Sequence, residues 1–222
     1  MTEYLAPGLF LILWVVHSWL VERSRWRTHA LSWHMEEERR KWMQTMARRE
    51  LRMIDTNIIS GLQSGTAFFA STSLLAIGAA FTLLNNTDSF LGIAQSLPAL
   101  VRTSDPTAFQ IKAIGLMLLY AYAFLKFGWA YRLFNYASIL VGMVPMPKEE
   151  DREAEVESCV EKATAMCVEA GREFNRGQRA FFIAIGYLGW FFGDIFFVFS
   201  TLAVYTIMVT RQFFSPAHHA VD

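Results

Sequence analysis

Apolar residues dominate four long stretches of this 222-residue chain, and polar residues fill the segments between them. Each stretch approaches or exceeds the roughly 20 helical residues that cross a hydrocarbon layer of about 30 Å. Charges are rare inside the stretches, whereas a soluble helical protein carries them along one face of each helix. The pattern therefore predicts four membrane-spanning helices, at Tyr4–Val21, Ile58–Leu84, Phe109–Val144 and Ala180–Val209.

The polar segments between these stretches differ in charge. Nine Lys or Arg residues lie in residues 22–57 and six in residues 145–179, whereas residues 85–108 contain only Arg102. Because cytoplasmic segments retain positive charge, we expect the first two segments in the cytoplasm and the third as an outer loop. Both termini are then predicted outside. A bacterial inner membrane, with periplasmic termini, is the expected location.

Both cytoplasmic segments look helical. Residues 22–57 contain no Gly or Pro and repeat apolar residues at helical spacing, so one helix is expected to continue into the second span. It either docks on its own bundle or lies on anionic headgroups. The segment Glu149–Gly177 is acidic at its start and basic at its end, as the helix dipole favours; its acidic face is a candidate partner for Arg48 and Arg49.

The predicted fold class is therefore all-α: an integral membrane four-helix bundle with two cytoplasmic helical extensions, forming a single domain over residues 1–222. Small residues indicate where its helices approach closely. Gly61 and Gly65 form a GxxxG pair, as do Gly189 and Gly193, with Gly186 one turn earlier. Such a seam packs either within the chain or against a second chain.

Four charged residues fall within the predicted spans, Lys112, Lys126, Arg132 and Asp194, and we consider Asp194 and Lys126 the most informative of them. Asp194 stands near the centre of the fourth span, where a carboxylate is costly unless it is neutralised, paired or hydrated. Lys126 is its candidate partner, although its side chain also reaches the inner surface by extending along the helix. Three interpretations of Asp194 follow. It forms a structural ion pair, it is part of an ion or proton pathway, or its carboxyl is protonated and hydrogen-bonded to second-span hydroxyls.

Composition argues against several other functions. The formal net charge is zero, so bulk charge indicates no nucleic-acid partner. No nucleophile elbow, phosphate-binding loop or dinucleotide fingerprint appears, and the cysteines and histidines lack metal-ligand spacing. His17 has no second intramembrane histidine for a haem, so we interpret it as a hydrogen-bonded residue near the membrane surface. We therefore predict no catalytic residue, no metal and no cofactor.

Three segments resemble a known family: Arg52–Gln63 (RMIDTNIISGLQ), Phe68–Leu75 (FFASTSLL) and Phe127–Tyr136 (FGWAYRLFNY). Together they resemble the uncharacterised multi-span membrane proteins catalogued as domain of unknown function 599. The resemblance implies a four-span topology and no particular activity. Four residues match polar positions of that family, and we hypothesise that they form one network on the cytoplasmic side: Asp55, Asn57, Arg132 and Asn135.

Three functions follow from these observations. The first is a non-catalytic scaffold or accessory subunit of a membrane assembly, embedded in the lipid bilayer as a homo-oligomer or as part of a larger complex. The second is an oligomeric ion channel or transporter that uses Asp194 and Lys126. The third is a membrane enzyme or cofactor carrier. Because a single four-helix bundle is too narrow for an obvious pore, the second function requires an oligomer or a cavity.

Overall fold

A computed structural model describes residues 5–96, 105–146 and 153–216, and all regular secondary structure in these ranges is helical. The predicted all-α class is confirmed, while Arg102 and Lys148 lie outside the described residues. Seven α-helices and two 3₁₀ helices follow in this order: α1 (Leu5–Glu22), η2 (Arg25–His29), α2 (Leu31–Ala47), α3 (Met53–Asn85), α4 (Thr87–Ser96), α5 (Pro106–Met143), α6 (Glu153–Tyr187), η4 (Leu188–Phe192) and α7 (Asp194–Phe213).

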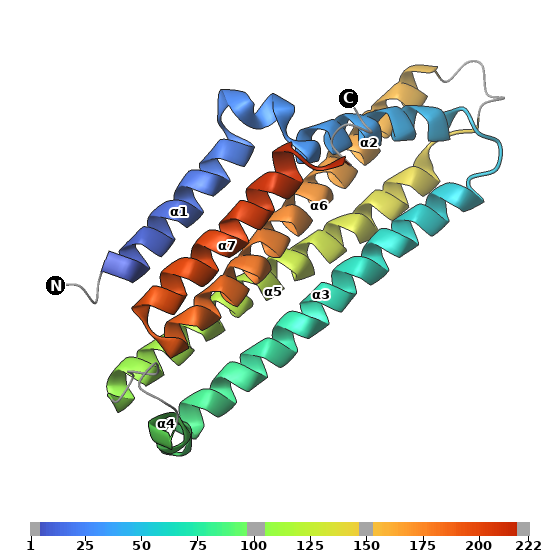
Figure 1. The fold of residues 1–222 in the computed structure, drawn as a ribbon. Helices are drawn as coiled ribbons and strands as arrows, with labels where there is room; N and C mark the ends of the chain where they lie inside the picture. Colours follow the sequence, from blue (N-terminus) through green and yellow to red (C-terminus); the bar gives the residue numbers. More distant parts are fainter. Residues whose placement is uncertain (1–4, 97–104, 147–152, 217–222) are drawn as a thin grey trace.

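The long helices lie side by side, with α5 packed between α3 and α6 (Figure 1). Helix α7 lies beside α6, and α1 lies beside α7. Aromatic rings fill the centre: the buried Phe127 of α5 stacks on Phe69 of α3, with ring centroids 5.4 Å apart, and contacts Phe174 of α6 at 5.6 Å. Apolar packing therefore joins helices that are distant in the sequence.

Three of the helices are long and apolar enough to cross a membrane: α3 with 33 residues, α5 with 38 and α7 with 20. Much of their apolar surface faces outward, including Leu75, Leu125 and Phe199, whose side chains are at least two-thirds exposed. Exposed apolar surface on this scale is typical of helices solvated by lipid. These helices indicate an integral membrane protein. Helices α3 and α5 correspond to the second and third predicted spans.

The fourth predicted span is not a single helix, which corrects the expectation for Ala180–Val209. Helix α6 ends at Tyr187, η4 follows, and the chain reverses at Gly193 before α7 begins. Gly193 has φ 124° and ψ 166°, a conformation that residues with a Cβ rarely adopt. The carbonyl of Trp190 accepts hydrogen bonds from the Gly193 amide at 3.3 Å and from the Lys112 ammonium at 2.9 Å, which holds the turn against α5.

This turn changes where the chain ends. Near the start of α1, the Phe10 ring lies 5.5 Å from the Tyr187 ring at the end of α6. At the end of α7, the Gln212 side-chain amide donates to the Ser32 hydroxyl of α2 at 2.6 Å. The two ends of the described chain thus lie at opposite ends of the bundle (Figure 1). The side of the membrane on which each terminus lies stays a prediction.

The expected continuous helix through residues 22–57 is also interrupted, because residues 48–52 separate α2 from α3. Tertiary contacts explain the break. The Arg52 guanidinium donates to the carbonyls of Val144 and Pro145 after α5, and Arg49 donates to the Asp55 carboxylate at 2.6 Å. Arg49 is therefore paired within its own segment, and residues 149–152 of its predicted acidic partner lie outside the described residues.

Candidate functional site

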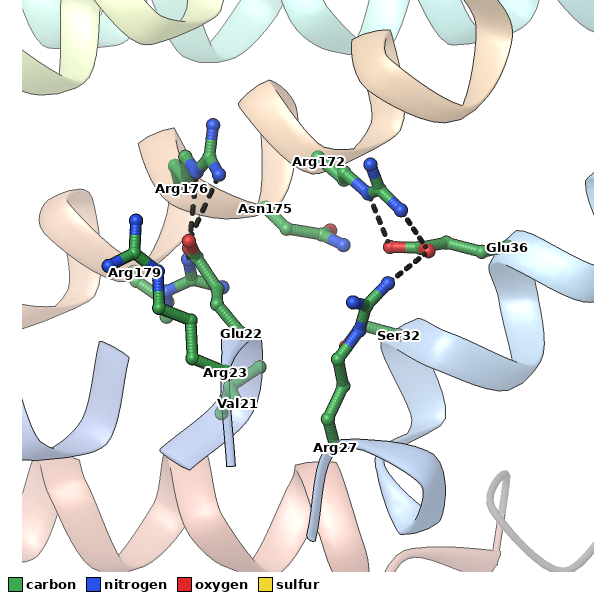
Figure 2. A pocket seen from close by; sticks show the side chains of 10 residues that line it. All are labelled: Val21, Glu22, Arg23, Arg27, Ser32, Glu36, Arg172, Asn175, Arg176 and Arg179. Atoms are coloured by element: carbon green, nitrogen blue, oxygen red, sulfur yellow. Dashed lines mark hydrogen bonds and ion pairs between the residues drawn. The ribbon is translucent and has the colours of Figure 1, made fainter. Parts of the chain in front are cut away.

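Helix α6 presents a row of arginines on one face. Arg172, Arg176 and Arg179 are four and three residues apart, so their side chains line up along the helix. That face meets the end of α1 and the start of α2, which supply the carboxylates of Glu22 and Glu36 (Figure 2). We call the end of the bundle formed by these five residues the arginine end.

Glu36 fastens α2 to α6. Its two carboxylate oxygens accept hydrogen bonds from Arg172 at 2.9 and 2.7 Å, a bidentate geometry, and Arg27 of η2 donates at 3.0 Å. Burial alone raises the pKa of the Glu36 carboxyl, but the hydrogen bonds and charges of Arg172 and Arg27 outweigh burial and hold that pKa below its ordinary value. Glu36 is therefore a carboxylate at neutral pH and a firm attachment point.

Glu22 fastens α1 to α6. The guanidinium of Arg176 donates to its two oxygens at 3.1 and 3.0 Å, and Arg179 donates to the same carboxylate. Figure 2 shows Asn175 between the Glu22 and Glu36 groups. The last residue of α1 is thus joined to two arginines of α6 by charge-assisted hydrogen bonds, which are stronger than neutral ones.

The ion pairs continue to the centre of the bundle. Glu173, whose side chain is 5% exposed, accepts a hydrogen bond from the Lys126 ammonium of α5 at 2.8 Å and another from Arg176. A continuous chain of charged contacts therefore runs from α5 through α6 to α1. Such a network fixes register, but its buried charges contribute little net stability once their desolvation is counted.

Two adjoining cavities open beside this network. The first cavity, of about 170 Å³, lies between α1, η2, α2 and α6. Two carboxylates, Glu22 and Glu36, face it, and the guanidinium groups outnumber them, so its formal charge is +3. Its five arginines are Arg23, Arg27, Arg172, Arg176 and Arg179.

The second cavity, of about 330 Å³, lies between α1, α2, α6 and α7 and shares Arg179 with the first. Its charged lining consists of Arg39, Arg179 and Arg211, and none of the described residues that line it is acidic. Its volume is near the lower limit of sites that bind small organic molecules. The rest of its wall mixes polar groups with the apolar side chains Val21, Leu31, Met35, Phe182 and Met208.

His17 lines the second cavity and is 6% exposed. Neither ring nitrogen has a hydrogen-bond partner among the described residues. The His17 ring contacts the Tyr205 ring, with ring centroids 5.7 Å apart. A buried polar group without a partner costs about 1–3 kcal/mol, so the His17 ring adds hydrogen-bonding capacity to this wall.

The family assignment is consistent with a membrane protein without an assigned chemistry. A sequence profile described as "Protein of unknown function, DUF599" matches residues 5–217. The chain belongs to the DUF599 family. No curated protein and no solved structure matches it. The resemblance to this family that the sequence suggested is therefore confirmed.

The predicted pair of Asp194 and Lys126 is not formed. Lys126 binds Glu173, whereas Asp194 is exposed at the first position of α7, where its carboxylate accepts a hydrogen bond from the Trp190 indole at 3.2 Å. Trp190 lies at the level of Lys112, fourteen residues before Lys126, which corresponds to about 21 Å along α5. The turn at Gly193 is the reason, because it moves Asp194 from mid-helix to the end of the bundle.

The four polar positions shared with the family have separate surroundings. The buried Asp55 accepts from the Trp42 indole at 2.7 Å and from Arg49. Asn135 accepts from the Gln63 side-chain amide at 2.7 Å, and Arg132 donates to its neighbour Tyr136 at 2.6 Å. No hydrogen bond or ion pair of the described residues joins any two of the four, and Asn57 is exposed. The hypothesised network therefore has no direct contact between its members.

The glycines divide into two groups. Gly186 and Gly189 face α7 closely: a Cβ built on Gly189 would lie 2.7 Å from the Phe196 carbonyl oxygen, and the Ser200 hydroxyl donates to the Gly186 carbonyl at 2.6 Å. Gly61 and Gly65 on α3 are not packed against another helix: a Cβ built on either would have no neighbour within 4 Å. Their face of α3 is open.

Sequence reasoning treated the α6 arginines as a complement to the helix dipole and missed their partners. The spacing of these arginines was the available signal. Cations that lie on one face of a helix packed against other helices need carboxylates nearby. Glu22 and Glu36 are more than 130 residues away in the chain, so no local pattern identified them. Among the described residues, no three His, Cys, Asp or Glu side chains come together as metal ligands.

Proposed function

We propose that this DUF599 protein is a non-catalytic membrane protein that binds an anionic ligand at its arginine end. The observation that carries the proposal is the excess of guanidinium groups over carboxylates around the two cavities, with no described acidic residue lining the second. Partly desolvated guanidinium groups bind phosphate or carboxylate oxygens through charge-assisted hydrogen bonds. The cavities provide the space in which such a group would be held.

In this proposal the arginine end lies at the cytoplasmic membrane surface. Seventeen residues separate Leu5 from Glu22 on α1, Phe109 from Lys126 on α5, and Asp194 from Arg211 on α7. Each interval is about 25 Å, close to the thickness of a hydrocarbon core. Charged groups thus stand at one level on three helices. Together with α3 and the end of α6, these helices would cross five times, which leaves the N-terminus outside and the C-terminus in the cytoplasm.

The alternative of an ion channel or transporter depended on Asp194 facing Lys126. With Lys126 bound to Glu173 and Asp194 exposed at the opposite end, the geometry offers no such intramembrane relay between them. Binding of an anion at the arginine end uses groups that the fold does bring together. We therefore favour binding over transport.

Thermal unfolding in a neutral detergent tests the proposal. Inorganic phosphate is compared with chloride at equal ionic strength, for the unmodified chain, Arg39→Gln and the control Arg25→Gln, whose exposed arginine lines neither cavity. Saturating ligand at 100 times its dissociation constant stabilises the fold by about 2.7 kcal/mol. Phosphate should raise the melting temperature of the unmodified chain and the control, and less so that of Arg39→Gln. An equal rise in all three is a general salt effect and contradicts the proposal.

A second candidate function, a scaffold or accessory subunit, is favoured by the open face of α3 at Gly61 and Gly65. Small residues in membrane helices allow a second helix backbone to approach closely. Native mass spectrometry of protein extracted from its membrane would detect a second copy or other subunits. Gly61→Leu should reduce that association, whereas Gly128→Leu, on an exposed position of α5, should not. A monomer in all samples would remove this candidate.

A further inference from the structure

We infer that the occupant of the second cavity is an anionic lipid of the cytoplasmic leaflet, bound through its headgroup phosphate. The inference rests on the proposed function, because it names the class of anion that the arginine end takes. It adds a distinction that the positive charge alone does not make. A soluble phosphate needs only cations, whereas a lipid also needs an apolar wall beneath them and a position at the membrane surface.

The polarity of the second cavity changes with depth. Helices α1 and α7 run toward α2 at the arginine end, and α6 runs away from it, so residue numbers order the wall along the bundle. Phe182 and Met208 lie at the deeper end, and Arg211, Gln212 and Ser215 lie at the outer end. From Asn175 to Phe182 on α6 this gradient covers about 10 Å. An amphiphile with a charged head and an apolar chain matches that order.

Cations from three different elements surround the outer part of the cavity: Arg39 of α2, Arg179 of α6 and Arg211 of α7. Arg179 is bound to Glu22, whereas Arg39 and Arg211 have no carboxylate partner among the described residues. The Arg39 guanidinium lies against Gly171 of α6, where a built Cβ would come within 2.7 Å of it. Arg39 is therefore held at the cavity by backbone packing, with its charge available to an anion.

The position of the cavity favours a lipid over a soluble anion. Arg211 stands seventeen residues from the far end of α7, at the level where the proposed membrane surface lies. A headgroup phosphate of the cytoplasmic leaflet reaches that level without leaving the bilayer. The cavity volume of about 330 Å³ suits a headgroup and the first part of a chain, while the remaining chain stays in the bilayer.

His17 adds a deeper polar group to the same wall. It lies one turn before Val21 on α1, among the apolar residues, and its ring nitrogens lack partners among the described residues. In a glycerolipid, ester oxygens lie between the phosphate and the acyl chains. An imidazole at this depth is suited to donate a hydrogen bond to such an oxygen, which inorganic phosphate does not carry.

Counting bound lipids by native mass spectrometry tests the inference. The full chain is reconstituted in nanodiscs of phosphatidylcholine containing one-fifth phosphatidylglycerol and then released into detergent. Retained phosphatidylglycerol should exceed retained phosphatidylcholine about tenfold after correction for their abundance, which corresponds to about 1.4 kcal/mol. Arg211→Gln should lower this preference about fivefold, whereas Arg25→Gln, an exposed arginine at the same end outside both cavities, should change it less than about twofold.

Phe182→Ala separates the two sources of phosphate. It removes part of the apolar wall, so it should weaken retention of phosphatidylglycerol and leave the stabilisation by inorganic phosphate unchanged. Equal retention of the two lipids, or an equal loss in Arg25→Gln and Arg211→Gln, overturns the inference. If inorganic phosphate still stabilises the protein in an Arg39-dependent manner, the proposed function survives that result. If neither anion binds, both fail.

Discussion

Arginine side chains serve two purposes in this protein, and their partners decide which. Arg172 has its guanidinium matched to both oxygens of Glu36, so it acts as a fastener between α6 and α2. Arg211 is exposed at the end of α7 and lines a cavity without acidic residues among those described. The same residue type thus holds the fold in one place and, under the proposed function, offers a binding group in the other.

Glu36→Gln should destabilise the fold more than Glu37→Gln. The Glu36 side chain is 10% exposed, and its replacement leaves Arg27 without its carboxylate and Arg172 with Glu169 alone. Glu37, in contrast, is 42% exposed and pairs with Arg40 on the surface. We expect a loss of about 1–2 kcal/mol for Glu36→Gln, after allowing for solvent screening of the arginines, and less than about 0.5 kcal/mol for Glu37→Gln. Thermal unfolding in detergent at pH 7 measures both.

The difference between the unmodified chain and Glu36→Gln should also depend on pH. Because the pKa of Glu36 is lowered in the folded state, its ionised form contributes stability above the ordinary pKa of 4.5, and that contribution is lost as pH falls through the folded-state value. The two melting temperatures should therefore converge below about pH 4. A difference that stays constant down to pH 3 would show that the carboxylate charge is not what holds α2.

At the scale of elements, the hairpin of α6 and α7 determines the architecture. Its turn is almost entirely apolar, Leu188-Gly-Trp-Phe-Phe192, yet the backbone reverses there because Gly193 adopts positive φ and Gly189 allows α7 to approach. Trp190 connects the turn to α5 through its carbonyl and to α7 through its indole. A stretch that hydropathy treats as one crossing is therefore two antiparallel helices.

Gly193→Ala should weaken this hairpin. A residue with a Cβ at φ 124° is strained, so we expect a loss of about 1–3 kcal/mol in the free energy of unfolding. Gly128→Ala on α5 is the matched control, because it is exposed, helical and has open space around a built Cβ. It should be neutral or stabilising by up to about 1 kcal/mol. Equal melting temperatures for the two variants would contradict the role of the turn.

At the scale of the whole molecule, the hairpin places the start of α1 and the end of α7 at opposite ends of the bundle. An arrangement with five crossings predicts a cytoplasmic C-terminus, whereas the four-span arrangement predicts a C-terminus outside. A bacterial reporter distinguishes them: green fluorescent protein fused after residue 222 should fluoresce, and alkaline phosphatase fused there should be inactive. When the same two reporters are fused at the N-terminus, alkaline phosphatase should be active and green fluorescent protein should not fluoresce. Active phosphatase at the C-terminus would restore the four-span arrangement.

Hydropathy was sufficient to locate α3 and α5, because each is one long apolar run with clear ends, such as Asp105-Pro106 before α5. It failed for the hairpin, since residues 188–192 contain no polar residue to mark a turn. The pair Gly193-Asp194 was the available signal. A carboxylate is favourable at the start of a helix, where it interacts with the helix dipole, and unfavourable inside the hydrocarbon layer. Interpreting Asp194 as a buried charge concealed that boundary.

The site was less accessible to sequence reasoning than the helices. The α6 arginines stand at an evident helical spacing, but their partners come from α1 and α2, and only the folded chain brings Glu22 and Glu36 to them. The break after α2 has the same origin, because Arg52 is held by carbonyls at the end of α5 more than ninety residues later. Local propensity cannot specify contacts of such long range.

Arg179 borders both cavities while its guanidinium donates to Glu22, the last residue of α1. A phosphate that draws this guanidinium toward the second cavity must compete with the Glu22 carboxylate. Thermodynamic reciprocity then requires that breaking the Arg179–Glu22 contact strengthens binding, and that binding weakens this contact by the same factor. One shared side chain would thus let the occupancy of the cavity be sensed at the amino-terminal helix.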